Sequence, residues 1–335
     1  MHARRPVRRK QPALRQRAAS ELWNRVNGPA PDMAREGTLT TPDRTALPVA
    51  DALAGVQPDQ TLGEALMPEL AHQPSGERTV PEDDTTLRVF VPGLNTPEPE
   101  SSRRTQYYAD HLGQPMLHLH NGTHLNGEEG GQLDYLEAAA VRFGLKETPL
   151  MESFRELLQA ALMKAEPEDV HAILYSDATI GGTRVIKQLR RDLIQKRLSD
   201  GVPGQEATAQ VDALLDEHLF VELHGNAAED LVPGPRWALW TDIKDGFTHN
   251  QPLGFGPQLG LSGSQRDADA SAMYLDYDGP FSGGDAHNLA STGVHAVRAI
   301  WEANGVSSTQ ELFEQVGPVH MPPVTQGDAS ESWGP

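Results

Sequence analysis

The sequence predicts an α/β protein in which helices flank both faces of a mostly parallel central sheet. Short apolar segments typical of buried strands alternate along the chain with longer segments of helical periodicity, which is the order that βαβ units produce. No repeat of about 20–50 residues is visible, so a solenoid is not expected. With 335 residues, 38% of them hydrophobic, the chain is long enough for one large domain or two small ones.

The predicted elements follow one another from residue 87 onward. The first strand, in LRVFVPGLNT, is ended by a Pro-Gly turn. The most apolar strand is VHAILYS, and the long helix after it ends at Asp200 and Gly201. The remaining strands are expected over residues 115–123, 218–225, 236–242 and 272–278. The other helices are expected over 97–111, 132–145, 205–217, 288–304 and 309–316, and from Pro149, which suits a first helical turn.

Residues 1–85 differ from the rest of the chain in composition. Pro, Gln, Arg and Thr are frequent there and apolar periodicity is weak, a pattern typical of disordered segments. Short helices fit the pattern only near residues 18–26 and 61–70. We therefore expect a long disordered, basic and Pro-rich N-terminal region (1–85), an α/β domain (86–320) and a flexible tail (321–335).

The net charge of −19 is distributed unevenly along the chain. Residues 1–17 contain Arg and Lys but no acid, so all 47 acidic residues lie in the rest of the chain. Such an acidic body repels phosphate backbones, which argues against nucleic-acid binding by the folded domain. The basic N-terminus is the segment suited to contact an anionic partner.

The sequence also lacks the features of several classes of protein. It has no cysteine, which rules out disulfides, thiolate metal sites and a cysteine nucleophile. No stretch reaches the roughly 18 apolar residues of a membrane span, and no apolar segment follows the basic start as in a secretory signal. We therefore expect a cytoplasmic protein without a transmembrane segment. No Gly-rich dinucleotide or phosphate loop is present, and we expect no cofactor.

The stretch LYSDATIGG has the layout of a catalytic turn between a strand and a helix. A serine hydrolase on a parallel sheet needs its nucleophile at such a sharp turn, where the flanking positions are usually small. Ser176 has the correct strand length before it and the small Ala178 after it, although Leu174 is large. Thr179 is the alternative nucleophile, but it requires a longer strand and is β-branched, while Asp177 would be crowded by its neighbours.

These segments and their order resemble the α/β-hydrolase superfamily, in its lipase/esterase-like branch, over residues 87–304. VFVPGLNT is similar to the early strand and loop that supply one oxyanion N–H, here that of Leu94. HAILYSDAT is similar to the strand, nucleophile turn and helix start, which implies a second oxyanion N–H from Asp177. The sequence departs from the family pattern at Leu174 and Ala178, where glycine is common.

Later segments resemble the parts of the family that carry the catalytic acid and histidine. Asp245 lies where the family acid is expected, and GGDAHNLAST resembles the loop with the catalytic histidine, here His287. The order Ser176, Asp245, His287 is that of the superfamily. Asp242 is the alternative acid, and His249 is the alternative base, although it follows Asp245 too closely to match that order.

The resemblance implies a serine hydrolase that cleaves a carboxylic ester, of a small molecule or a lipid, with a Ser-His-Asp triad. The alternative is a catalytically inactive hydrolase-fold protein that acts in binding or interaction. The bulky Leu174 and the long N-terminal region favour this second interpretation.

Three histidines lie close together in HLHNGTH. Alternation along a strand places His118 and His120 on one face, and with His124 they would offer three nitrogen ligands to zinc. No acid close in sequence completes a standard ligand set. We therefore expect no metal.

Overall fold

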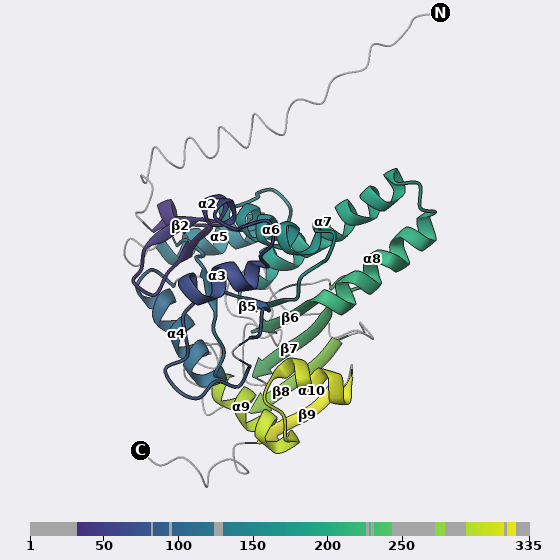
Figure 1. The fold of residues 1–335 in the computed structure, drawn as a ribbon. Coiled ribbons are helices and arrows are strands. Elements are labelled where there is room, and N and C mark those ends of the chain that lie inside the picture. The colour runs from purple at the N-terminus through teal and green to yellow at the C-terminus, as the bar shows by residue number, and fades with distance from the viewer. Residues whose placement is uncertain are drawn as a thin grey trace, which may run out of the picture.

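The computed structural model of the chain describes residues 32–81, 83–93, 96–123, 130–225, 228, 231–242, 272–278, 293–317 and 320–325 (Figure 1). These residues form one nine-stranded sheet in the order β2-β1-β4-β3-β5-β6-β7-β8-β9. The strands are β1 (Thr38–Thr40), β2 (Ala46–Pro48), β3 (Leu87–Val91), β4 (Leu117–Leu119), β5 (Val170–Tyr175), β6 (Leu219–His224), β7 (Arg236–Asp242), β8 (Ala272–Asp278) and β9 (His320–Thr325).

Seven of these strands, from β4 to β9 across the sheet, run parallel, while β1 and β2 are antiparallel at one edge. Every residue of β3, β5 and β6 is buried, because helices cover both faces. The prediction of a mostly parallel α/β sheet is therefore confirmed. The strands β7 and β8 have the bounds that the sequence predicts.

Most helices lie between consecutive parallel strands, and local sequence signals fix several of their ends. Thr61 and Glu64 form a capping box at the start of α3, and the Thr148 hydroxyl accepts a hydrogen bond from the Met151 N–H at the start of α6. The helices are η1 (Met33–Arg35), α2 (Val49–Ala54), α3 (Leu62–Leu70), α4 (Glu100–Leu112), α5 (Gly130–Arg142), α6 (Pro149–Leu162), α7 (Ala178–Ser199), α8 (Gly204–His218), α9 (Gly293–Asn304) and α10 (Thr309–Val316).

The sheet separates two hydrophobic cores, since consecutive strand residues point to opposite faces. In β5, Leu174 lies in the core covered by α2, α3 and α5–α8, whereas Tyr175 lies in the core covered by α4, α9 and α10. Figure 1 shows α7 and α8 as a long helical hairpin that extends beyond the sheet. Arg190 and Asp212 join the two helices through hydrogen bonds of 2.6 and 2.9 Å.

The expectation of a disordered segment up to residue 85 is wrong from residue 32 onward. β1 pairs with β4, and Leu39, Leu62 and Leu66 are buried in the larger core. A strand of three residues with mixed composition is too short to show a periodic pattern. Its conformation is specified instead by pairing with the rest of the sheet. Residues 1–31 lie outside the described part of the chain.

The expected tail boundary is also wrong, because β9 extends the sheet to Thr325. β9 is an edge strand of the sheet. Its two consecutive prolines, Pro322 and Pro323, have no N–H to donate to a further strand, which suits this position. Residues 326–335 lie outside the described part of the chain. A search of the described helices for one long and apolar enough to cross a membrane found none.

Candidate active site

Ser176 lies at the turn between β5 and α7 and has a backbone φ of +58°. This left-handed conformation is uncommon for a residue with a Cβ, and strain of this kind costs on the order of 1–3 kcal/mol. Among the described residues, the other non-glycine residue with positive φ is Arg44, in the turn between β1 and β2. Ser176 is therefore a strained serine at the carboxyl end of a central parallel strand.

Hydrogen bonds to the backbone hold this turn in place. The Ser176 N–H donates to the carbonyl of His224 at the end of β6 (2.8 Å), which extends the β5–β6 pairing by one residue. The Ser176 carbonyl accepts from the N–H (3.1 Å) and the hydroxyl (2.5 Å) of Thr179. Thr179 is fully buried, whereas Ser176 is half-buried. The Thr179 hydroxyl therefore supports the turn, and Ser176 is the better placed of the two candidate nucleophiles.

The large Leu174 fits beside the turn because α7 has a glycine opposite it. Leu174 is fully buried, and a Cβ on Gly182 would lie 2.3 Å from the Leu174 Cδ1 atom. A Cβ on Gly181 would have more room, at 3.4 Å from Met151. Gly182 thus provides the space that the large Leu174 side chain needs, and it allows the strand and helix to approach closely.

The loop after β3 reaches the same turn. A Cβ on Gly93 would lie 2.7 Å from the Ser176 Cβ, so only glycine lets the loop pass this close. Asn121, which follows β4, donates from Nδ2 to the carbonyl of Pro92 (3.1 Å) and to the carboxylate of Asp177 (3.4 Å). Asn121 therefore connects the loop after β3 to the turn after β5, and the sequence patterns did not single it out.

Asp177 is the N-cap residue of α7, a helix of 22 residues, and is half-buried. The N-terminal end of a helix carries a partial positive charge, because its first N–H groups lack partners within the helix. An oxyanion formed at the Ser176 turn would therefore lie at a favourable end of α7.

The other predicted site residues are located only in part. Asp242 is the last residue of β7, paired with Tyr277 in β8, and it lies at the same edge of the sheet as Ser176 because β5, β6 and β7 are parallel. The positions that fall outside the described residues are those of Leu94, His124, Asp245, His249 and His287. The structure thus brings Ser176 and Asp177 together with Asn121 and Gly93, and places the backbone of Asp242 at the same edge.

A cavity of about 30 Å³, room for one water molecule, lies beside Asp177 and is lined also by Asn121 and Glu36. Burial and the neighbouring charge of Glu137 raise the pKa of Glu36 to about 7, against the opposing effect of Lys146. Glu36 lies in the segment that was expected to be disordered, so sequence patterns did not indicate a titratable group here.

One strand away from Ser176, β6 carries a buried carboxylate. Glu222 accepts hydrogen bonds from Trp240 Nε1 (2.7 Å) and the Thr309 hydroxyl (3.0 Å). It also lies 2.7 Å from His171 Nε2 and 3.3 Å from His224 Nε2. Burial alone would raise the pKa of Glu222, but its contacts with the two histidines hold that pKa well below its usual range. This network fixes β6, whose His224 carbonyl binds the N–H of the candidate nucleophile.

His118 and His120 lie on one face of the sheet, as predicted, and both are fully buried. The carboxylate of Glu98 lies next to the two rings, which the sequence did not predict. Burial, together with the charges of His120, His72 and Arg35, lowers the pKa of His118 well below its usual value, so its ring is neutral at physiological pH.

Comparison of the chain with protein-family models, curated proteins and solved structures found no match.

Proposed function

We propose that the protein is a serine hydrolase of the α/β-hydrolase fold, with Ser176 as the nucleophile that attacks a carboxylic ester. The observation that carries the proposal is the positive φ of Ser176 at the β5–α7 turn. In the nucleophile turn of such hydrolases, a strained strand-to-helix connection presents the serine hydroxyl at the edge of the sheet. A strained conformation of this kind is retained at functional sites, where it forms part of the mechanism.

The proposed oxyanion hole consists of the N–H groups of Asp177 and Leu94. Asp177 follows the nucleophile at the N-terminus of α7, and Gly93, the neighbour of Leu94, lies against the Ser176 Cβ. The loop after β3 and the residue after the nucleophile are the two sources of these donors in the fold. Each such donor typically stabilises the transition state by about 3–4 kcal/mol.

In the proposed reaction, His287 accepts the proton of the Ser176 hydroxyl as the oxygen attacks the ester carbonyl. The tetrahedral intermediate then expels the alcohol, which takes the proton from His287, and leaves an acyl group on Ser176. Water, activated by the same histidine, attacks the acyl group and releases the carboxylic acid. Asp245 holds the histidine tautomer, with Asp242 as the alternative acid.

Hydrolysis of short p-nitrophenyl esters tests this proposal. We expect Ser176→Ala and His287→Ala each to lower kcat by at least about 10⁴-fold. Comparison of Asp245→Ala with Asp242→Ala identifies the acid, since only one of the two should cause a comparable loss. A wild-type protein that hydrolyses none of the esters, or variants as active as wild type, would overturn the proposal. Either result would favour the alternative, a catalytically inactive hydrolase-fold protein that acts in binding or interaction.

A further inference from the structure

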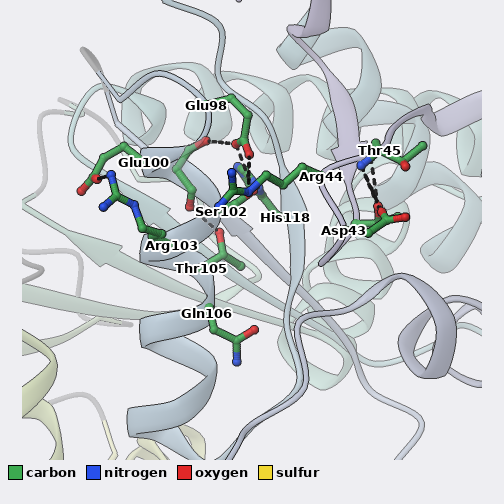
Figure 2. A network of polar contacts seen from close by, with 12 residues as sticks. Asp43, Arg44, Thr45, Glu98, Glu100, Ser102, Arg103, Thr105, Gln106 and His118 are labelled. Atoms are coloured by element: carbon green, nitrogen blue, oxygen red, sulfur yellow. Dashed lines mark hydrogen bonds and ion pairs between the residues drawn. The ribbon is translucent and has the colours of Figure 1, made fainter.

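A buried cluster of ligand-type side chains lies where β4 meets the start of α4. His118 is the middle residue of β4, His120 directly follows that strand, and Glu98 comes from the loop before α4. One ligand atom of each of these three residues lies within 4.8 Å of those of the other two. Figure 2 shows the Glu98 side chain reaching toward Ser102, Arg44 and His118.

The hydroxyl groups around Glu98 are too few for the acceptors they face. Ser101 and Ser102 donate to Glu98 Oε2 over 2.8 and 2.9 Å. The same hydroxyls lie 3.3 Å from His120 Nδ1 and 3.4 Å from His118 Nδ1. A serine hydroxyl has a single proton, so it cannot donate to a carboxylate and to an imidazole at once. With both serine protons on Glu98, an Nδ1 lone pair of either neutral imidazole lacks a donor among the described residues.

An outer carboxylate fixes the orientation of His120. The His120 Nε2 atom lies 3.1 Å from Asp32 Oδ2, and an ionised carboxylate only accepts hydrogen bonds, so Nε2 carries the proton. The backbone N–H groups of Glu98 and Thr123, each at 3.0 Å, hold Asp32 in this position. In the neutral ring the lone pair of His120 is then on Nδ1, which lies 3.3 Å from the Ser101 hydroxyl oxygen. Metal-binding histidines commonly donate their second N–H to a carboxylate in this way.

His118 and Glu98 each have a polar atom that the protein leaves unsatisfied. The fully buried Nε2 atom of His118 and the Oε1 atom of Glu98 have no hydrogen-bond partner within the described chain. The contact between Glu98 Oε1 and Arg44 Nε is a long ion pair of 3.9 Å. Buried polar atoms are normally satisfied, so these two unsatisfied atoms in one cluster of side chains indicate a missing partner.

We infer that Glu98, His118 and His120 form a binding site for a divalent cation of the zinc class. Two imidazole nitrogens and one carboxylate oxygen are ligands that Zn²⁺ prefers, and its charge would satisfy the lone pairs that the two serine protons do not. Such an ion would join the β3–α4 loop to β4. None of the three ligands is among the proposed hydrolase residues, and occupancy of the site does not depend on that activity.

Arg44 covers this site from the β1–β2 turn. Its side chain is 54% exposed, whereas that of Glu98 is 7% exposed. The guanidinium group therefore lies between the buried carboxylate and solvent, and its positive charge opposes that of an incoming cation. Replacement of Arg44 removes this repulsion and leaves all three ligands in place.

The experiment is calorimetric titration of the chelator-treated, full-length protein with Zn²⁺ at neutral pH, with visible absorption of bound Co²⁺ as a second readout. We expect one equivalent to bind tightly to the wild type. Glu98→Gln removes a ligand and should weaken binding by at least about 100-fold, and Asp32→Asn should weaken it by about 10–100-fold. Arg44→Gln should tighten binding by about tenfold.

His218→Gln is the matched control, because His218 also contacts a carboxylate, that of Asp169 at 2.9 Å, but lies outside the cluster. This variant should bind Zn²⁺ as the wild type does. Circular dichroism and the metal-free Tm of each variant show whether it folds. If Glu98→Gln does not fold, the Arg44→Gln titration decides. The inference is overturned if the wild type binds no stoichiometric Zn²⁺, if folded Glu98→Gln binds it equally well, or if Arg44→Gln binds it no more tightly.

Discussion

The side chain of Leu174 occupies the space that any side chain at Gly182 would need, since a Cβ there would lie 2.3 Å from the Leu174 Cδ1 atom. Leu174 is two residues before Ser176, and Gly182 lies in the second turn of α7. The strand and the helix that flank the strained turn therefore pack closely against each other at Leu174 and Gly182. A bulky residue at position 174 is compatible with this turn as long as position 182 remains glycine.

Gly182→Ala should destabilise the protein by about 1–3 kcal/mol, because the added methyl group overpacks the contact with Leu174. In a Leu174→Ala background the same substitution should cost little, since the clash is removed. Urea unfolding of the two single variants and the double variant measures this coupling. Gly181→Ala is the control, because its Cβ would have an ordinary 3.4 Å contact. Additive effects of the substitutions at 174 and 182 would contradict the fit.

Gly93→Ala should reduce ester hydrolysis by roughly 100-fold, because its Cβ would lie 2.7 Å from that of Ser176 and displace either the loop or the turn. Gly76→Ala, where an added Cβ has nothing within 4 Å, should have wild-type activity. Steady-state kinetics on a p-nitrophenyl ester compares the two variants. Equal activity of both would show that the loop after β3 does not constrain Ser176.

Glu36→Gln should stabilise the protein at high pH and have little effect in acid. The folded state raises the pKa of Glu36 from 4.5 to about 7, so the folded protein retains this proton while the unfolded chain releases it. The stability of the wild type therefore falls as pH rises from about 4.5 to about 7, by about 3 kcal/mol from this group, whereas that of the variant does not. Denaturation at pH 5 and pH 8 measures the difference, and an equal effect at both pH values is the contradicting result.

A truncated variant that begins at Asp32 should unfold cooperatively, because it keeps all nine strands of the sheet and both hydrophobic cores. Removal of residues 1–85 should abolish cooperative unfolding, because it deletes β1, β2, α2 and α3 and exposes the core around Leu39 and Leu66. Thermal unfolding followed by circular dichroism distinguishes the two variants. A cooperative transition in the shorter one would show that the N-terminal elements are dispensable.

The sequence predicts the parallel sheet and most of its helices because these elements are long and strongly patterned. The bounds of β7, β8 and α10 agree with the predicted ranges. The strands β1 and β2 were missed because each has three residues and depends on pairing with β4 or with one another. β9 was missed because its two prolines are typical of a turn or tail rather than of a strand.

The candidate site is less visible in the sequence because it depends on contacts between distant segments. The pattern around Ser176 indicates a strand-to-helix turn, but its positive φ is a property of the folded backbone. The role of Gly93 depends on how closely two loops approach. Glu98 was missed as a partner of His118 because 19 residues and a helix separate them in the chain.

The central claim, that Ser176 is an activated nucleophile, is tested most directly by covalent labelling with a fluorophosphonate probe and mapping of the modified peptide by mass spectrometry. We predict one label per chain, on Ser176, that is lost in Ser176→Ala and retained in Thr179→Ala. An unlabelled wild-type protein, or a label that persists in Ser176→Ala, would contradict the claim.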